Sequence, residues 1–217
     1  MAGTRLNGGI ALVTGASSGT GKDVCFALAE AGVKAILLAD LNLPTDLTRQ
    51  ECQKFASHSN FRALSVMVDV TDEASVDNMV QRAVSELGQP HSYTSTRSNM
   101  TRSLGRGSIV VLSSINGLIS VPGMMPYTAS KHATIGIAQT AAVDNFEHRV
   151  RVNIKTTSNV PTLKQAIAKL CPLGRIAMPE EVSDAVVFIC RPAASFINGE
   201  SLVIDAGFTL TGFRMGH

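Results

Sequence analysis

Residues Thr14–Gly21, with the sequence TGASSGTG, are the part of this 217-residue chain from which most of the architecture can be predicted. They follow the apolar run Ile10–Val13 and precede a segment with helical periodicity, Lys22–Ala31. A strand that ends in a glycine-rich turn and continues as a helix directs the unpaired N–H groups of that helix outward, where they can bind a pyrophosphate. The sequence therefore predicts a strand, a turn and a helix that together bind a dinucleotide.

The glycines and serines of this turn are the first predicted cofactor-binding residues. Among Gly15, Gly19 and Gly21, one permits the tight turn, one lets the backbone approach phosphate closely, and one lets the helix pack against the strand. Ser17 and Ser18 lie between the first two glycines and are assigned to the same site. Because glycine spacing alone is a weak signal, the prediction needs a second feature.

That second feature is an acidic residue after the next predicted strand, Ala35–Ala39. Asp40 follows this strand directly, close to the interval at which dinucleotide-binding folds place a ribose-binding acid. Its carboxylate would accept hydrogen bonds from the adenosine ribose and repel a 2′-phosphate. This favours NAD as the cofactor, with NADP as the second option. The alternative is that Asp40 only opens the loop at residues 41–44.

The composition limits the classes of function. The chain has 45% hydrophobic residues, enough for one domain of ordinary size over residues 1–217. Its 19 basic and 17 acidic residues give a net charge of +2, so the sequence predicts neither a nucleic-acid partner nor a membrane-surface partner. No long apolar stretch of the signal-peptide type precedes the glycine turn, which predicts a cytoplasmic protein.

The four cysteines indicate neither a metal site nor a disulfide framework. They are scattered along the chain without CxxC pairs and without histidines at metal-ligand spacing. This distribution fits a reducing environment inside the cell. The cysteines are Cys25, Cys52, Cys171 and Cys190.

Strand and helix periodicities alternate through the first third of the chain. This alternation predicts an α/β fold, a doubly wound parallel sheet with right-handed crossovers and helices on both faces. After the third strand, Asp69 and Val70 precede Thr71, which is the predicted N-cap of the next helix. The predicted strands are 10–13, 35–39 and 63–68, and the predicted helices are 22–31, 45–57 and 73–87.

Residues 89–106 interrupt the alternation. Their sequence, QPHSYTSTRSNMTRSLGR, is rich in Ser, Thr and Arg, has no periodicity, and predicts a disordered surface loop. The segment is too short to hold an average strand, an average helix and their connections. An anion-binding patch formed by Arg97, Arg102 and Arg106 is the alternative interpretation.

Regular structure returns in the second half of the chain. A predicted strand at 108–112 ends at Ser113 and Ser114, and a turn-rich loop leads to a long predicted helix at 127–146. A short strand is predicted at 149–154, and residues 155–162 have no clear form. The remaining predicted elements are helices at 163–170 and 179–190 and a strand at 202–204.

Three side chains in this half form a candidate acid–base set. Tyr127 and Lys131 are four residues apart on one face of the predicted helix, and Ser114 follows a strand, at the end where parallel sheets bind ligands. A phenol ionises at about pH 10 in water, so it needs a nearby cation, here Lys131, to exchange protons near neutrality. A serine hydroxyl can hold a substrate oxygen. Such a set can protonate an alkoxide as hydride reaches its carbon, or catalyse the reverse step. Taken alone, a YxxxK pattern more often marks an amphipathic helix start with a solvated lysine.

These motifs, in this order, resemble the short-chain dehydrogenase/reductase family, whose pattern is a TGxxxGxG turn, then a serine, then YxxxK. The resemblance extends over nearly the whole chain. It rests on GGIALVTGASSGTGK, the Asp69-Val70 pair, GSIVVLSS, PYTASKHA, the RVN of residues 151–153, PLGRIAMPEEVSDAVVFI and FINGESLVIDAG.

The resemblance implies a Rossmann-type, NAD(P)-dependent oxidoreductase that interconverts a secondary alcohol and a ketone. It implies that the three glycines of the turn line the pyrophosphate site. Asp40 would contact the ribose, and Asp69 and Val70 would contact the adenine.

The resemblance also implies a role for each member of the acid–base set. Tyr127 would be the acid or base, and it would bind the cofactor together with Lys131. Lys131 would hold the nicotinamide ribose and stabilise the phenolate. Ser114 would orient the carbonyl group of the substrate. Asn153 would order the backbone rather than act in catalysis.

The chain departs from the family pattern at residues 89–106. The family normally has a central strand ending in an Asn-Asn-Ala-Gly-like turn, followed by a helix whose asparagine anchors a proton-relay water, and neither is found in the sequence. Asn99 is not assigned this role. The loss predicts either that 108–112 pairs with 10–13, which would shift Ser114 by about 4.8 Å, or that the domain is destabilised. After Asn153, IKTTSNVPTLKQAI replaces the Pro-Gly turn of the family.

Two classes of function follow from these observations. The first is an active oxidoreductase for a small carbonyl or alcohol substrate, in secondary metabolism by resemblance. The alternative is a redox-inactive relative, either a pseudoenzyme or a truncated splice form, that acts only by binding. Family members commonly form tetramers partly through the helix that is missing, so homo-oligomerisation is left open.

Overall fold

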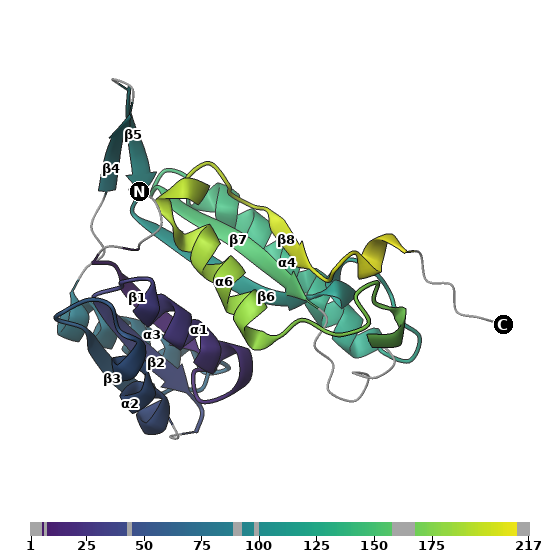
Figure 1. Ribbon diagram of the computed structural model, residues 1–217, viewed down its shortest axis with the longest axis horizontal. Helices are drawn as coiled ribbons and strands as arrows, with labels where there is room; N and C mark the ends of the chain where they lie inside the picture. Colours follow the sequence, from purple (N-terminus) through teal and green to yellow (C-terminus); the bar gives the residue numbers. More distant parts are fainter. Residues whose placement is uncertain are drawn as a thin grey trace. The chain divides into compact units, whose positions relative to one another are not determined.

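The computed structural model describes residues 6, 8–42, 45–88, 93–97, 100–157 and 168–211 (Figure 1). The chain divides into two units. The first unit comprises Met1–Arg106 and Ser183–Ala194, and the second comprises Gly107–Val182 and Ser195–His217. Each unit is described by itself, and the expectation of one domain over residues 1–217 stays a prediction.

The first unit is built on a parallel sheet with the strand order β1-β2-β3. Residue Ile10 pairs with Ala35, and Ala35 pairs with Arg62. The central strand is buried from Ala35 to Ala39, because a parallel strand covered on both faces needs a continuous apolar run. The strands are β1 (Ile10–Thr14), β2 (Ala35–Asp40) and β3 (Arg62–Met67).

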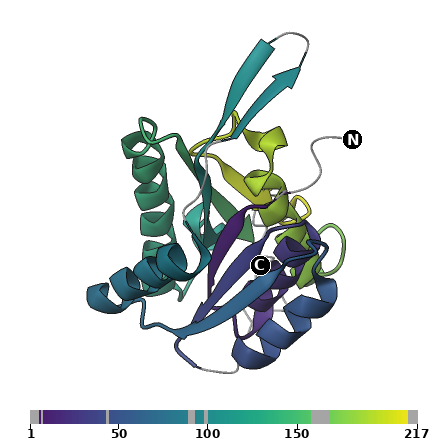
Figure 2. The ribbon, with the colours of Figure 1, turned by 90° about the vertical axis from the view of Figure 1, so that its left-hand side faces the viewer.

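Helices cover both faces of this sheet. Figure 2 shows α3 on one side of the strands and α1 and α2 on the other. Met79 of α3 and Leu87 pack into one core cluster with Leu37, Ala39 and Val66. The helices are α1 (Gly19–Glu30), α2 (Thr45–Phe55) and α3 (Glu73–Arg82), which continues as the π-helix η1 (Ala83–Leu87).

The N-cap predicted for α3 is wrong by one residue. The cap is Asp72, whose carboxylate accepts a hydrogen bond from the N–H of Ala74 at 3.2 Å. Thr71 instead donates both its N–H and its hydroxyl to Asp69 Oδ1, at 2.9 and 2.7 Å. An aspartate is a better cap than a threonine, and Thr71 is already engaged one residue earlier.

The prediction of a loop without regular structure at 89–106 is wrong for two described pieces of that segment. β4 (Tyr93–Arg97) and β5 (Met100–Gly105) pair antiparallel, with Thr96 opposite Thr101. Threonine is β-branched and favours strands. It is also polar, and the polar composition of the segment suggested a loop. The side chains of Arg97 and Arg102 lie outside the described part of the chain, so the anion-binding patch stays a prediction.

The second unit has its own parallel sheet, with the strand order β6-β7-β8. Gly107 pairs with Val150, and Ile154 pairs with Ser201. The helix α4 covers one face of this sheet, where Ile135 and Ala138 pack on Val152 and Ile154. The strands are β6 (Gly107–Ser114), β7 (Val150–Thr157) and β8 (Ser201–Ile204), and α4 is Met125–Asp144.

The other elements of the second half agree with the predicted periodicity. The helix α6 (Pro179–Cys190) has the predicted bounds and carries Glu180 and Glu181 in its first turn. Of the helix predicted at 163–170, only residues 168–170 are described, and they are helical. Within the described residues of this half there are also 3₁₀ turns, which are η2 (Ile115–Gly117), η4 (Pro192–Ala194) and η5 (Phe208–Leu210).

The two alternatives for residues 108–112, pairing with 10–13 or a destabilised domain, stay predictions, because the two segments belong to different units. The structure pairs β1 with β2, and β6 with β7 in a register that sets Ser108 opposite Arg151. The α/β fold and its parallel strands are confirmed, with one three-stranded parallel sheet described in each unit. β1 and β6 are edge strands, and both expose apolar side chains, at Leu12, Ile109 and Leu112.

The central strand β7 buries a lysine. Lys155 is 1% exposed, and within the described part of the chain its Nζ has no hydrogen-bond partner. Burial favours the neutral amine, which lowers the pKa of Lys155 to about 7. The folded second unit therefore carries the cost of a buried, unpaired ammonium at neutral pH.

Replacing this lysine should change how stability depends on pH. An unfolded lysine keeps its proton up to its ordinary pKa of 10.5, whereas folded Lys155 loses it above about 7. Below pH 7 both states hold the proton and the cost of burial is complete, and this cost falls as the pH rises from about 7 to about 10.5. The free energy of unfolding of the wild type should rise across this window, by at most about 1.4 kcal/mol per pH unit.

Urea denaturation between pH 7 and pH 10 measures this effect. Lys155→Met should be more stable than the wild type at pH 7, by up to a few kcal/mol, and should lack the rise. Lys34→Met, at an exposed lysine, should keep the rise of the wild type. Equal pH slopes for the wild type and Lys155→Met would show that Lys155 does not titrate in this window.

Candidate functional site

The glycine-rich turn after β1 has the geometry that a phosphate-binding turn requires. Gly15 and Gly19 have φ angles of +68° and +53°, in the region that favours glycine. A Cβ atom on either would meet nothing within 4 Å among the described atoms, so the backbone is open on that side. A Cβ atom on Gly21 would lie 2.1 Å from the carbonyl oxygen of Gly15. Only a glycine at position 21 lets α1 start so close to the strand.

The first turn of α1 carries no acidic side chain of its own. The N-cap of this helix is Ser18, whose side chain makes no capping hydrogen bond. The first N–H groups of a helix have no partner within the helix and carry a partial positive charge, so they can donate hydrogen bonds to an anion. Ser18 and the glycines thus form a surface suited to a phosphate group.

Asp40 ties the end of β2 to the glycine turn. Its Oδ2 atom accepts hydrogen bonds from the N–H of Ser17 at 3.0 Å and from the hydroxyl of Ser17 at 2.6 Å. Its Oδ1 atom accepts from the N–H of Asn42 at 3.2 Å, which is the loop-opening contact of the alternative interpretation. Burial raises the pKa of Asp40, but the hydrogen bonds from Ser17, Asn42 and Leu41 outweigh it and lower the pKa overall.

Asp69 and Val70 lie after β3, on the surface. Two hydrogen bonds from Thr71, first from its hydroxyl and then from its N–H, lower the pKa of the Asp69 carboxyl group. The N–H of Asp69 donates to the hydroxyl of Ser75 at 3.1 Å. Val70 exposes 64% of its surface, so an apolar side chain is available here for a flat ligand group such as adenine.

The second unit holds the candidate acid–base set. Ser114 is the last residue of β6 and is 1% exposed, and its Oγ atom accepts the N–H of Asn116 at 3.3 Å. Tyr127 and Lys131 lie in the first two turns of α4, where the Nζ atom of Lys131 is 5.6 Å from the centre of the Tyr127 ring. This distance is within the range of a cation–π contact.

Three contacts hold the turn after β6 against α4. The hydroxyl of Ser113 donates to the carbonyl oxygen of Lys131 at 3.2 Å. The side-chain amide of Asn116 donates to the hydroxyl of Thr128 at 3.4 Å. Gly117 has no room for a Cβ atom, which would lie 2.8 Å from the carbonyl oxygen of Lys131. The segment that begins with Ser114 and the helix that carries Tyr127 are therefore brought together.

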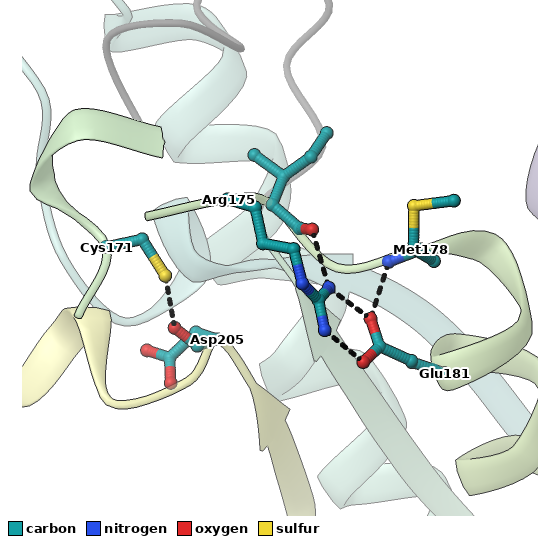
Figure 3. Close-up of polar contacts among 6 residues, drawn as sticks. Cys171, Arg175, Met178, Glu181 and Asp205 are labelled. Carbon is teal, nitrogen blue, oxygen red and sulfur yellow. Dashed lines mark hydrogen bonds and ion pairs between the residues drawn. The ribbon is translucent and has the colours of Figure 1, made fainter. Parts of the chain in front are cut away.

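A segment near the C-terminus packs behind this turn. Ile115 is buried in a cluster with Cys171 and Phe208. Figure 3 shows the polar contacts that fix this segment, in which the Arg175 guanidinium binds both carboxylate oxygens of Glu181, each at 2.7 Å. The hydrogen bonds from Arg175, and then from the N–H of Met178, lower the pKa of Glu181 to about 2. Cys171 donates its thiol to the carbonyl oxygen of Asp205 at 3.7 Å.

The described residues give little sign of metal or membrane chemistry. Among them, no group of three or more His, Cys, Asp or Glu side chains is arranged to hold a metal ion. No helix within the described ranges has the length and apolar character needed to cross a membrane.

Comparison with known proteins gives matches over nearly the whole chain. Residues 9–91 match the family described as short chain dehydrogenase, and residues 90–209 match that described as Enoyl-(Acyl carrier protein) reductase. A short-chain dehydrogenase of Penicillium roqueforti, anuF, is 32% identical over 265 residues, covering 93% of this chain and 96% of the relative. The chain belongs to the short-chain dehydrogenase/reductase family.

Other members of the family are similar in sequence and in structure. A cyclohexanol dehydrogenase of an Acinetobacter species is 29% identical, over 94% of this chain and 96% of that protein. The solved structure of a short-chain type dehydrogenase/reductase from Mycobacterium marinum has a TM-score of 0.80 and 26% identity, covering 95% of this chain and 97% of that one. The fold is therefore the Rossmann-like fold of the family.

The comparison also supports the predicted loss of internal residues. The alignment with the Penicillium roqueforti relative extends over 265 residues, whereas this whole chain has 217. The relative therefore contains residues without counterpart within this chain. This agrees with the three-stranded sheet described in each unit, in which β1 and β6 are edge strands.

Sequence reasoning missed several polar residues of the site. Asn116 and Ser113 were not predicted to act, yet both link the turn after β6 to α4. Ser17 was assigned to the cofactor, yet its hydroxyl is donated to Asp40. The only signal for Asn116 in the sequence is its place two residues after Ser114, where a polar side chain stands between apolar ones.

Two alanine substitutions in the second unit should change the free energy of unfolding in opposite directions. Gly117→Ala would place a methyl group 2.6 Å from Ile135 Cδ1 and 2.8 Å from a backbone oxygen, so it should lower the free energy of unfolding by about 1–3 kcal/mol. Gly136→Ala lies inside α4, where a Cβ atom meets nothing within 4 Å among the described atoms, and should raise it by about 0.5–1 kcal/mol. Urea denaturation of both variants measures the two signs, and a neutral Gly117→Ala would contradict the packing described.

Proposed function

We propose that the chain is a short-chain dehydrogenase/reductase that uses NAD, in preference to NADP, to interconvert a secondary alcohol and a ketone. The observation that carries the proposal is the pairing of Tyr127 with Lys131 on α4, next to the turn that begins at Ser114. A small, mainly apolar carbonyl or alcohol is the proposed substrate, and the cytoplasm is the proposed location. The cyclohexanol dehydrogenase relative is consistent with this substrate class.

The residues of the first unit fit a nicotinamide dinucleotide. The open turn at Gly15 and Gly19 and the uncapped start of α1 suit its pyrophosphate, which carries negative charge. Asp40 and Asp69 offer carboxylate oxygens to the hydroxyl groups and the adenine of the same ligand. The lowered pKa of each keeps both side chains ionised near neutral pH.

The residues of the second unit would handle the proton of the reaction. When bound, the nicotinamide supplies or accepts the hydride. In the reductive direction, the Tyr127 hydroxyl gives its proton to the oxygen that becomes the alcohol, and the Lys131 ammonium stabilises the phenolate left behind. The Ser114 hydroxyl would orient the carbonyl oxygen, and the N–H of Asn116 holds Ser114 Oγ in place.

A redox-inactive role is the second candidate, and one observation favours it. The alignment with the Penicillium roqueforti relative is longer than this chain, so the chain lacks residues that the relative has. Catalysis of hydride transfer needs the reacting groups placed to within about 1 Å, a demand that binding of a dinucleotide alone does not make. In this case the first unit would bind NAD and the second would not turn over a substrate.

The acid–base proposal is tested by Tyr127→Phe. This variant keeps the ring beside Lys131 and removes the proton, so turnover of a panel of secondary alcohols with NAD should fall by at least about 100-fold. Binding of NADH, measured by its fluorescence, should not change. If the wild type and Tyr127→Phe show the same residual rate while both bind NADH, the redox-inactive role replaces the oxidoreductase.

The cofactor preference is tested by Asp40→Asn. The variant keeps an oxygen that can accept from Ser17 but removes the charge that repels a 2′-phosphate. The ratio of the dissociation constants for NADPH and NADH should therefore fall by about tenfold or more, which corresponds to about 1.4 kcal/mol. Asp69→Asn is the matched control and should leave the ratio unchanged. An unchanged ratio in Asp40→Asn would assign Asp40 to the loop alone.

A further inference from the structure

The helices α1 and α2 of the first unit meet along an interface with paired contacts at successive turns. Lys22 Nζ binds Glu51 Oε2 at 2.5 Å at one end of this interface. The rings of Phe26 and Phe55 stack at the other end, with their centres 4.9 Å apart. These contacts fix the two helices side by side and set which residues between them face each other.

Two thiols face each other between these contacts. Cys25 lies between Lys22 and Phe26 in α1, and Cys52 lies between Glu51 and Phe55 in α2. Both side chains are 0% exposed, and each thiol perturbs the pKa of the other. Both are free cysteines. Along the chain, one helix precedes β2 and the other follows it.

We propose that Cys25 and Cys52 are a site of reversible oxidation and form an intramolecular disulfide that links α1 to α2. A disulfide needs two sulfur atoms brought together from suitably spaced backbone. The packed helix pair holds both cysteines in one buried interface before any oxidation. The site lies within the first unit and does not depend on the oxidoreductase function proposed above.

The chemistry balances with a disulfide of low molecular weight, such as oxidised glutathione, as the oxidant. The Cys52 thiolate attacks one sulfur of oxidised glutathione and releases one glutathione as thiolate, leaving a mixed disulfide on Cys52. Cys25 then loses its proton and attacks the sulfur of Cys52, which releases the second glutathione. The two protein thiols give up two electrons and two protons, and one oxidised glutathione becomes two reduced molecules.

The two thiols are suited to different steps of this sequence. The interaction with Cys52, together with burial, raises the pKa of Cys25, whereas the interaction with Cys25 lowers the pKa of Cys52. The thiolate is the nucleophile in thiol–disulfide exchange, so Cys52 attacks first and Cys25 resolves the mixed disulfide. Both thiols are buried, so oxidation requires a local opening of the interface between α1 and α2.

The bond would close a loop that contains all of β2. Such a cross-link restricts the unfolded chain and stabilises the folded one when the geometry is unstrained. The helix that starts at the glycine turn would then be joined to the helix that follows Asp40. Oxidation should therefore raise the apparent Tm of the full chain by roughly 5–10 °C, and a reductant should reverse the change.

Peptide mass spectrometry of the full chain tests the proposal. The reduced protein is incubated in native buffer with oxidised glutathione, its remaining thiols are alkylated, and it is digested with trypsin. Cys25 is carried by the peptide 23–34 and Cys52 by the peptide 50–54, because Lys22, Lys34, Arg49 and Lys54 flank them. The expected product is these two peptides joined with the loss of two hydrogen atoms.

Matched variants assign the bond. Cys25→Ser and Cys52→Ser should abolish both the joined peptides and the Tm rise, whereas Cys171→Ser and Cys190→Ser should keep both. The wild-type measurement stands by itself if a serine variant fails to fold. Joined peptides that form only in urea, or a bond from Cys25 or Cys52 to Cys171 or Cys190, would overturn the proposal. Complete glutathionylation without any joined peptides would overturn it as well.

Discussion

Both units depend on the same constraint, which is that a helix can pack on the turn after a parallel strand only where the nearest residue has no side chain. In the first unit Gly21 lies against the carbonyl oxygen of Gly15, and in the second Gly117 lies against that of Lys131. A Cβ atom would be 2.1 Å from the first oxygen and 2.8 Å from the second. These close approaches bring the start of α1 to the glycine turn and bring Lys131 to the segment after β6.

Polar contacts then fix what the packing brings together. Asp40 accepts two hydrogen bonds from Ser17, which join the end of β2 to the turn after β1. Ser113 and Asn116 do the same between the end of β6 and α4. Buried or partly buried polar groups need such partners, and here the partners are residues of the site itself. Lys155, whose buried Nζ has no hydrogen-bond partner in the described part of the chain, is one exception.

The periodicity of the sequence predicted most helices and strands, because burial on one or both faces imposes a regular pattern. It failed where side chains carry little such pattern. The antiparallel strands β4 and β5 are polar, so composition predicted a loop. Their pairing depends on backbone hydrogen bonds, and the only indication of it in the sequence is the preference of threonine for strands. The N-cap of α3 was missed for a related reason, since adjacent Thr71 and Asp72 are both acceptable caps.

The candidate site residues could be named from the sequence because each belongs to a local motif: a turn before a helix, an acid after a strand, and two residues one helical turn apart. Contacts between segments far apart in the sequence belong to no local motif. Neither the hydrogen bond of Ser17 to Asp40 nor the facing thiols of Cys25 and Cys52 can be seen in the order of residues. They exist because parallel strand pairing and helix packing set the register between segments. That register is a property of the folded backbone, which local composition does not encode.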